Sequence, residues 1–146
     1  MPLFLFLLAA AAGVMIPLQA VINARLGRAI GGPLWAAALS SVVVAIVLAS
    51  LALASGKPWP RLSQMTDLPW WAWTGGLCGA VVLSATTAVA PRIGTANMIA
   101  LVMTGQVIAA MTLDRLGWFE MAIQPFGVQR LAAAALLVAG AVLMTV

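Results

Sequence analysis

The segment Arg92-Ile93-Gly94-Thr95-Ala96-Asn97 opens an uncharged apolar run that closes at Leu113-Asp114-Arg115-Leu116-Gly117. Residues 95–113 carry no charge, and a helix that rises about 1.5 Å per residue over this length spans a hydrocarbon core of roughly 30 Å. Four further apolar runs of similar length occur in the chain. The sequence therefore predicts transmembrane helices at about 2–21, 33–54, 68–90, 95–113 and 127–146.

The composition supports the same class of protein. The chain has 146 residues, of which 64% are hydrophobic and only 7% are charged. A soluble domain carries about a quarter charged residues. We therefore predict an all-α integral membrane protein with a single transmembrane domain over residues 1–146, surrounded by membrane lipid.

Several functional classes are excluded or disfavoured by what the sequence lacks. It has no His and one Cys, Cys78, so it offers no imidazole base, no internal disulfide and no His or thiolate metal site. We expect no metal, no cofactor and no enzymatic activity. Nucleic acid is not an expected partner either, because the basic residues are dispersed among separate connections instead of forming a basic stripe. These residues are Arg25, Arg28, Lys57, Arg61, Arg92, Arg115 and Arg130.

Gln106 lies near the middle of the 95–113 run and is the first candidate for substrate binding. An amide in hydrocarbon has no water to bond, so it should face other helices or a wet cavity. It either contacts a substrate or ties two helices together, which is worth about 0.6 kcal/mol in measured cases and up to about 2 in model peptides. Asn97, a further candidate, is nine residues away and hence on the opposite face, unless the helix entry is unwound.

Three more side chains are candidates for substrate binding. Gln19 and Asn23 are four residues apart and share one helix face, where they either line the mouth of a cavity or solvate the helix end. Trp73 follows Trp70 and Trp71 in a cluster typical of an interfacial aromatic belt. Because Trp73 lies deeper, its indole can alternatively cover a flat or cationic ligand.

Small residues predict where helices pack closely. Gly75 and Gly79 form a small-xxx-small pair that allows another backbone to approach. Ala135 and Ala139 belong to a flat face that suits a helix–helix interface, within one chain or between two.

None of the three acids lies at the centre of a predicted span, and Asp114, just past the end of the 95–113 span, comes nearest to such a position. Beside Arg115 it most simply forms a surface ion pair worth less than about 1 kcal/mol. The alternative is a role as a proton carrier that couples transport to a proton gradient.

The loop charges are nearly balanced between the two sides of the membrane. Five spans place Lys57, Arg61 and Arg115 on the N-terminal side, with Arg130 at the boundary. The other side holds three basic residues, Arg25, Arg28 and Arg92. An excess of Lys and Arg sets orientation, and here the difference is one residue at most. We therefore predict insertion in both orientations and an antiparallel homodimer, which would create the inverted-repeat arrangement of transporters with a substrate site near the midplane.

Taken together, the motifs resemble the YdcZ family of small five-span proteins. They are Pro17-Leu18-Gln19-Ala20-Val21-Ile22-Asn23-Ala24-Arg25-Leu26-Gly27, Trp73-Thr74-Gly75-Gly76-Leu77-Cys78-Gly79-Ala80, Pro91-Arg92-Ile93-Gly94, Gly105-Gln106 and Asp114-Arg115-Leu116-Gly117. The resemblance implies the drug/metabolite transporter superfamily, the bacterial inner membrane and oppositely oriented pairs. It carries over seven motif positions, which are Gln19, Asn23, Gly75, Gly76, Gly79, Gln106 and Asp114.

The first span differs from that of a related group. In the small multidrug resistance proteins a Glu in the first helix couples protons to cation export, whereas the first span here has no carboxylate. The sequence thus favours a transporter or facilitator for a small neutral, zwitterionic or weakly polar metabolite or drug. A small dual-topology ion channel is an alternative, although the glycine, arginine and asparagine signatures of the fluoride channels are missing. A non-transporting membrane subunit is another, against which the balanced loop charges argue.

Overall fold

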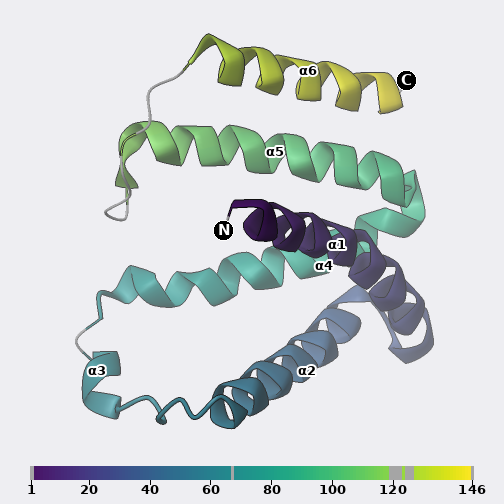
Figure 1. Cartoon of the computed structure of the whole chain (residues 1–146). Helices are drawn as coiled ribbons and strands as arrows, with labels where there is room; N and C mark the ends of the chain where they lie inside the picture. Colours follow the sequence, from purple (N-terminus) through teal and green to yellow (C-terminus); the bar gives the residue numbers. More distant parts are fainter. Residues whose placement is uncertain (1, 67, 119–122, 124–126, 146) are drawn as a thin grey trace. The chain divides into compact units, whose positions relative to one another are not determined.

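The computed structural model describes residues 2–66, 68–118, 123 and 127–145, and all regular elements within them are helices (Figure 1). The chain divides into two compact units, residues 1–92 and 93–146, which are described separately. Unit 1 holds α1 (Pro2–Ile30), α2 (Pro33–Ala54), α3 (Leu62–Thr66), the 3-10 helix η1 (Trp70–Thr74) and α4 (Gly75–Ile93). Unit 2 holds α5 (Thr95–Leu116) and α6 (Val128–Thr145).

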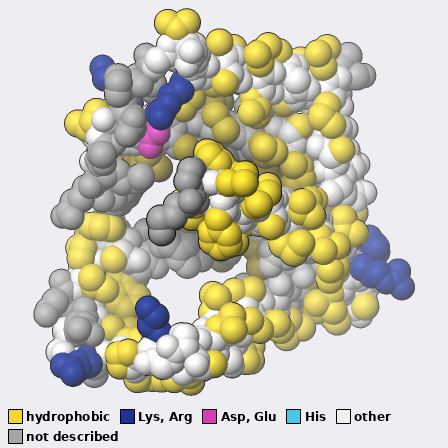
Figure 2. Space-filling view, viewed as in Figure 1, with side chains coloured by type: hydrophobic (Ala, Val, Ile, Leu, Met, Phe, Trp, Pro, Cys, Tyr) yellow, Lys and Arg dark blue, Asp and Glu magenta, His cyan; other side chains and the backbone are white. Residues whose placement is uncertain are grey.

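Five segments among the described residues are long and apolar enough to cross a membrane, as the sequence predicts. They are Leu3–Ile30, Pro33–Ala54, Trp70–Ile93, Thr95–Leu116 and Val128–Thr145. Most of their large hydrophobic side chains are exposed, and Figure 2 shows hydrophobic side chains over much of the visible surface. This exposure suits helices whose outer surface contacts lipid instead of water.

The first helix is longer than predicted. We expected the span to end at residue 21 and Arg25 to lie in a connection, but α1 continues to Ile30. At about 1.5 Å per residue its 29 residues span about 44 Å, more than the hydrocarbon core of roughly 30 Å. Charged residues limit the depth at which a helix can sit in lipid, but they do not stop the helix itself, because Arg is a good helix former.

The connection between α1 and α2 consists of Gly31 and Gly32, with φ angles of 97° and 132°. The Gly32 N–H donates to the Gly27 carbonyl over 2.7 Å. A Cβ on Gly27 would lie 3.0 Å from the Gly32 oxygen, closer than side chains normally approach. Glycine at position 27 therefore lets α1 and α2 meet tightly at this end, and Pro33 begins α2 as predicted.

Two other helix ends differ from the sequence expectation. The predicted turn at 91–94 shrinks to Gly94 (φ 86°), because α4 includes Pro91 and runs to Ile93. Likewise α5 runs to Leu116, so Asp114 lies in its last turn and not in a connection. Gly117 ends α5 in the left-handed conformation, with its N–H donating to the Leu113 carbonyl over 3.0 Å. Most of the rest of the predicted 114–126 connection lies outside the described residues.

Most of the buried residues of the two units are small, and Met98 of α5, which is 1% exposed, is the large exception. In unit 1 the buried residues include Ala20, Ala24, Ala36, Ala37, Thr86, Thr87 and Ala90. In unit 2 Ala141 is buried where α6 packs along α5. Close backbone approach between small residues is the usual way in which membrane helices gain packing energy.

Candidate functional site

Gln19 joins α1 to α2. Its Nε2 donates to the Ser40 Oγ over 3.5 Å, and both side chains are partly buried. The neighbouring Ser41 instead donates to the Ala37 carbonyl of its own helix over 2.9 Å. Gln19 therefore has a helix-linking contact, while the amide keeps further hydrogen-bonding capacity for a ligand.

Asn23 lies one turn beyond Gln19 on the same face of α1, and it is only 3% exposed. Its Nδ2 is buried and has no hydrogen-bond partner among the described residues. A buried donor without an acceptor costs about 1–3 kcal/mol. Native proteins rarely keep such a group unless an acceptor arrives from outside, as a water, a ligand or another chain.

Trp73 and the two predicted packing glycines lie at the start of the third span. Trp73 is in η1 and is 55% exposed. Gly75 and Gly79 lie in α4, and a Cβ on either would meet no described atom within 4 Å. Close packing at these glycines remains a prediction, and it requires a surface beyond the contacts that unit 1 makes.

Gln106 lies in the middle of α5, and its side chain is exposed although α6 packs against the same helix. Asn97 lies in the first turn of α5 and is partly exposed. Because α5 is regular from Thr95 onward, the two amides lie on opposite faces, as the nine-residue spacing predicts. Ala135 and Ala139 of α6 are also exposed. Their predicted interface therefore remains open for another surface.

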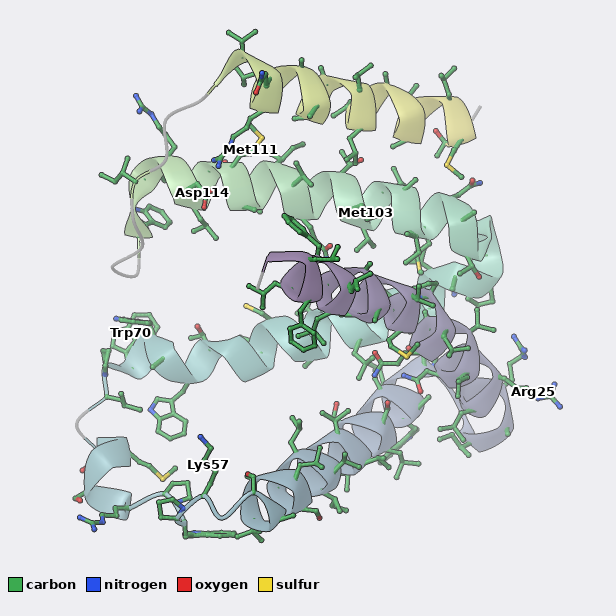
Figure 3. All side chains as sticks on the ribbon, in the orientation of Figure 1. Arg25, Lys57, Trp70, Met103, Met111 and Asp114 are labelled. Carbon is green, nitrogen blue, oxygen red and sulfur yellow. The ribbon has the colours of Figure 1, made fainter. Side chains whose placement is uncertain are left out.

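Asp114, labelled in Figure 3, forms an ion pair that connects α5 to α6. Its Oδ2 lies 3.4 Å from the Nη1 of Arg130, with the two side chains 33% and 51% exposed. The sequence predicts a pair with the adjacent Arg115, and a partner 16 positions away, such as Arg130, cannot be identified from spacing alone. Arg130 lies at the start of α6, so the pair links the two helices of unit 2.

Unit 1 contains three notable cavities. One, of 260 Å³, lies between α2 and α4 beside Ser41 and Ser84. The second, of 280 Å³, lies beside the C-terminal end of α2 and is lined by Lys57, Trp59 and Met65 among others. The third, of 210 Å³, is called here the arginine cavity. Its lining residues are Ala24, Gly27, Arg28, Gly32, Pro33, Thr87, Ala88, Pro91 and Arg92.

Sequence reasoning missed the arginine cavity. It treated Arg28 and Arg92 as separate surface anchors, since they are 64 positions apart and no spacing rule connects them. One signal was available: both are basic residues close to the end of an apolar run, with no acid nearby in the sequence. That signal places charge at the membrane surface, but it does not bring the two guanidinium groups to one cavity.

One family matches the chain nearly from end to end. The sequence model of the family described as "Putative inner membrane exporter, YdcZ" matches residues 4–143. Comparison with curated proteins and with solved structures gives no match. The family match agrees with the resemblance read from the motifs, and with five membrane-type helices it identifies a multi-pass inner membrane protein.

Proposed function

The chain belongs to the YdcZ family of inner membrane proteins and has a membrane transporter role, and from that premise we propose its mechanism and substrate class. We propose that it exports a small neutral, zwitterionic or weakly polar molecule by alternating access in an antiparallel homodimer. The observation that carries this proposal is the Asn23 Nδ2, a buried donor with no acceptor among the described residues. In the proposed cycle a substrate oxygen accepts that hydrogen bond.

The polar groups of the spans favour an uncharged or zwitterionic substrate. The candidate contacts Gln19, Asn23, Asn97 and Gln106 are amides, which both donate and accept hydrogen bonds but carry no charge. Asp114 lies in the last turn of α5, at the end of its span, and is paired with Arg130. A cation exchanged for protons usually needs an acid deep in the membrane, so this chemistry does not support that form of antiport.

A second copy would cover polar and small surfaces that one chain leaves open. Gln106 is exposed at the middle of α5, although an amide at this depth should not face lipid. Gly75 and Gly79 are open, and so are Ala135 and Ala139 on α6. We propose that these surfaces meet the partner copy and that Gln106 faces the substrate path.

The balance of loop charges supports an antiparallel pair over a parallel one. By span order three basic residues (Arg25, Arg28 and Arg92) lie on one side and four (Lys57, Arg61, Arg115 and Arg130) on the other. A difference of 4 − 3 = 1 gives the insertion machinery little preference. Molecules inserted both ways can form the inverted arrangement that places a substrate near the midplane.

Orientation is tested by labelling in intact cells. Cys78→Ser provides a background without cysteine, in which Ala29→Cys and Ser63→Cys report opposite ends of α2. With a membrane-impermeant maleimide, about half of the molecules should react at each position before permeabilisation, and all of them afterwards. Complete labelling at one position and none at the other would refute dual topology.

Transport is tested separately on proteoliposomes. Solid-supported membrane electrophysiology, screened over neutral, zwitterionic and charged metabolites at two pH values, should give substrate-dependent signals for uncharged or zwitterionic compounds. A neutral substrate moved without an ion gives no current, so uptake of labelled compound is measured alongside. Responses confined to permanent cations would contradict the proposed substrate class.

A further inference from the structure

Arg28 and Arg92 both line the arginine cavity, and its described lining residues include no acid. Arg28 reaches it from the last turn of α1, and Arg92 from the last turn of α4, both within unit 1. Within the described part of the chain, neither guanidinium group forms a hydrogen bond or an ion pair with another residue. Unit 1 has one acid in its sequence, Asp67, which lies outside the described residues.

Because Arg28 and Arg92 line the same cavity, an anion bound there would be attracted by two positive charges. Guanidinium also presents a planar fork of N–H donors that matches the oxygens of a phosphate. We therefore infer that the arginine cavity is a binding site for a phosphate-type oxyanion, the chemistry that an anionic phospholipid headgroup and a small soluble phosphate share.

The rest of the cavity wall agrees with a bound anion that approaches closely. Gly32 carries no side chain and a Cβ there would meet no described atom within 4 Å, so the backbone leaves room at this part of the cavity wall. Thr87 is 1% exposed, and its Oγ1 already donates to the Leu83 carbonyl over 2.7 Å. Thr87 therefore forms part of the cavity wall but offers no hydrogen-bond donor to an anion. The positive N-terminal end of α2 at Pro33 is opposed by the negative C-terminal ends of α1 and α4, so the helix ends add no net positive field and the two arginines make the site.

The depth of the cavity fits a headgroup. Arg28 is two residues from the end of α1, and Arg92 is one residue from the end of α4. Since α1 at about 44 Å is longer than the hydrocarbon core of roughly 30 Å, its last turn reaches the headgroup layer. Basic pockets between membrane helices are known to hold anionic headgroups. The inference concerns this cavity alone and does not depend on what the protein transports.

Arg25 supplies a matched control. It belongs to the same end of α1 and carries the same charge, but it does not line the cavity, and Figure 3 shows its side chain extending away from the helices. Arg25→Gln, Arg28→Gln and Arg92→Gln each remove one charge from this end of unit 1. Only the last two remove a guanidinium group from the cavity.

The lipid arm of the experiment uses the full chain in nanodiscs that contain phosphatidylcholine with a minor fraction of phosphatidylglycerol. Native mass spectrometry of the released protein counts retained lipids. We expect phosphatidylglycerol to be retained over phosphatidylcholine, with at least about tenfold weaker retention in Arg28→Gln and Arg92→Gln, and less than about threefold in Arg25→Gln. The double variant should lose little more than either single one, because both arginines hold the same anion.

The soluble arm uses nanodiscs of phosphatidylcholine alone, titrated with inorganic phosphate and with glycerol 3-phosphate. A rise in melting temperature of the unmodified chain, absent in Arg28→Gln, would identify a soluble oxyanion as the ligand. Folding of Arg28→Gln is checked by circular dichroism and gel filtration. If it fails to fold, Arg28→Lys replaces it, because this variant keeps the positive charge but loses the planar guanidinium donors. Equal losses in all three glutamine variants, or no preference for any phosphate in either arm, would overturn the inference.

Discussion

The Nε2 of Gln19 donates to the Oγ of Ser40 over 3.5 Å, and this hydrogen bond links α1 to α2 within unit 1. The residues are 21 positions apart, and both helices also meet at the tight Gly27 contact. The amide at this motif position is therefore part of the α1–α2 interface, whether or not a substrate also contacts it.

A double-mutant cycle on this pair should give a coupling of about 0.6 kcal/mol, the typical value for hydrogen bonds between membrane helices. The variants are Gln19→Leu, Ser40→Ala and their combination, measured by thermal unfolding in detergent. Ser41→Ala is the control, because the Ser41 hydroxyl bonds within its own helix. If Gln19→Leu couples equally to both serines, the bond to Ser40 is not the source.

Gly27→Ala should destabilise the α1–α2 pair by about 1–3 kcal/mol, since the added methyl would lie 3.0 Å from the Gly32 oxygen and 3.3 Å from the Pro33 Cα. Gly13→Ala, in the same helix, meets no described atom within 4 Å and should be neutral or slightly stabilising. The melting temperatures of the two variants test this prediction. Similar values for both would mean that the helices do not meet closely at Gly27.

Asn23→Leu should leave the protein as stable or raise its stability by about 1–3 kcal/mol, because it removes a buried donor that has no acceptor. The same variant should lose transport if the Asn23 amide contacts substrate. Unfolding and uptake are measured on one preparation. A clear loss of stability would show that the Nδ2 has an acceptor in the resting protein.

Gln106→Leu should fold normally, because the side chain is exposed within unit 2, but it should bind substrate more weakly. Losing one hydrogen bond of about 1 kcal/mol weakens affinity roughly fivefold. Met103→Leu, on the same helix and also exposed, is the control that conserves volume and polarity. Unchanged affinity in Gln106→Leu would leave this amide a helix-linking role only.

Asp114→Asn should lower stability by less than about 1 kcal/mol, since the pair with Arg130 is partly exposed to solvent. Arg130→Gln breaks the same ion pair and should have a similar effect. The two variants separate structure from coupling. If Asp114 carries a proton, only Asp114→Asn removes the pH dependence of transport, whereas a purely structural pair gives two variants with the same pH profile.

The number and the approximate positions of the spans were predictable, because uncharged apolar runs of this length typically form transmembrane helices. Helix ends were less predictable. Arg25 and Pro91 both suggested a stop, yet α1 and α4 continue past them. A charge ends the lipid-buried part of a helix without ending the helix, and a proline near a C-terminus removes one hydrogen bond that the last turn can lose.

The candidate site was predictable only as a set of residue types. Opposite faces for Asn97 and Gln106 followed from helical periodicity. The pairing of Asp114 with Arg130 did not, and neither did the meeting of Arg28 and Arg92 at one cavity, because both depend on which helix ends lie together. Periodicity acts within one helix, whereas these relationships form between helices.

Two glycines separate α1 from α2, and one separates α4 from α5. Connections of one or two residues are too short for one helix to insert during synthesis while the next helix remains at the membrane surface. The two helices of each such pair are therefore expected to enter the membrane together, so that neither helix can reverse its direction without the other.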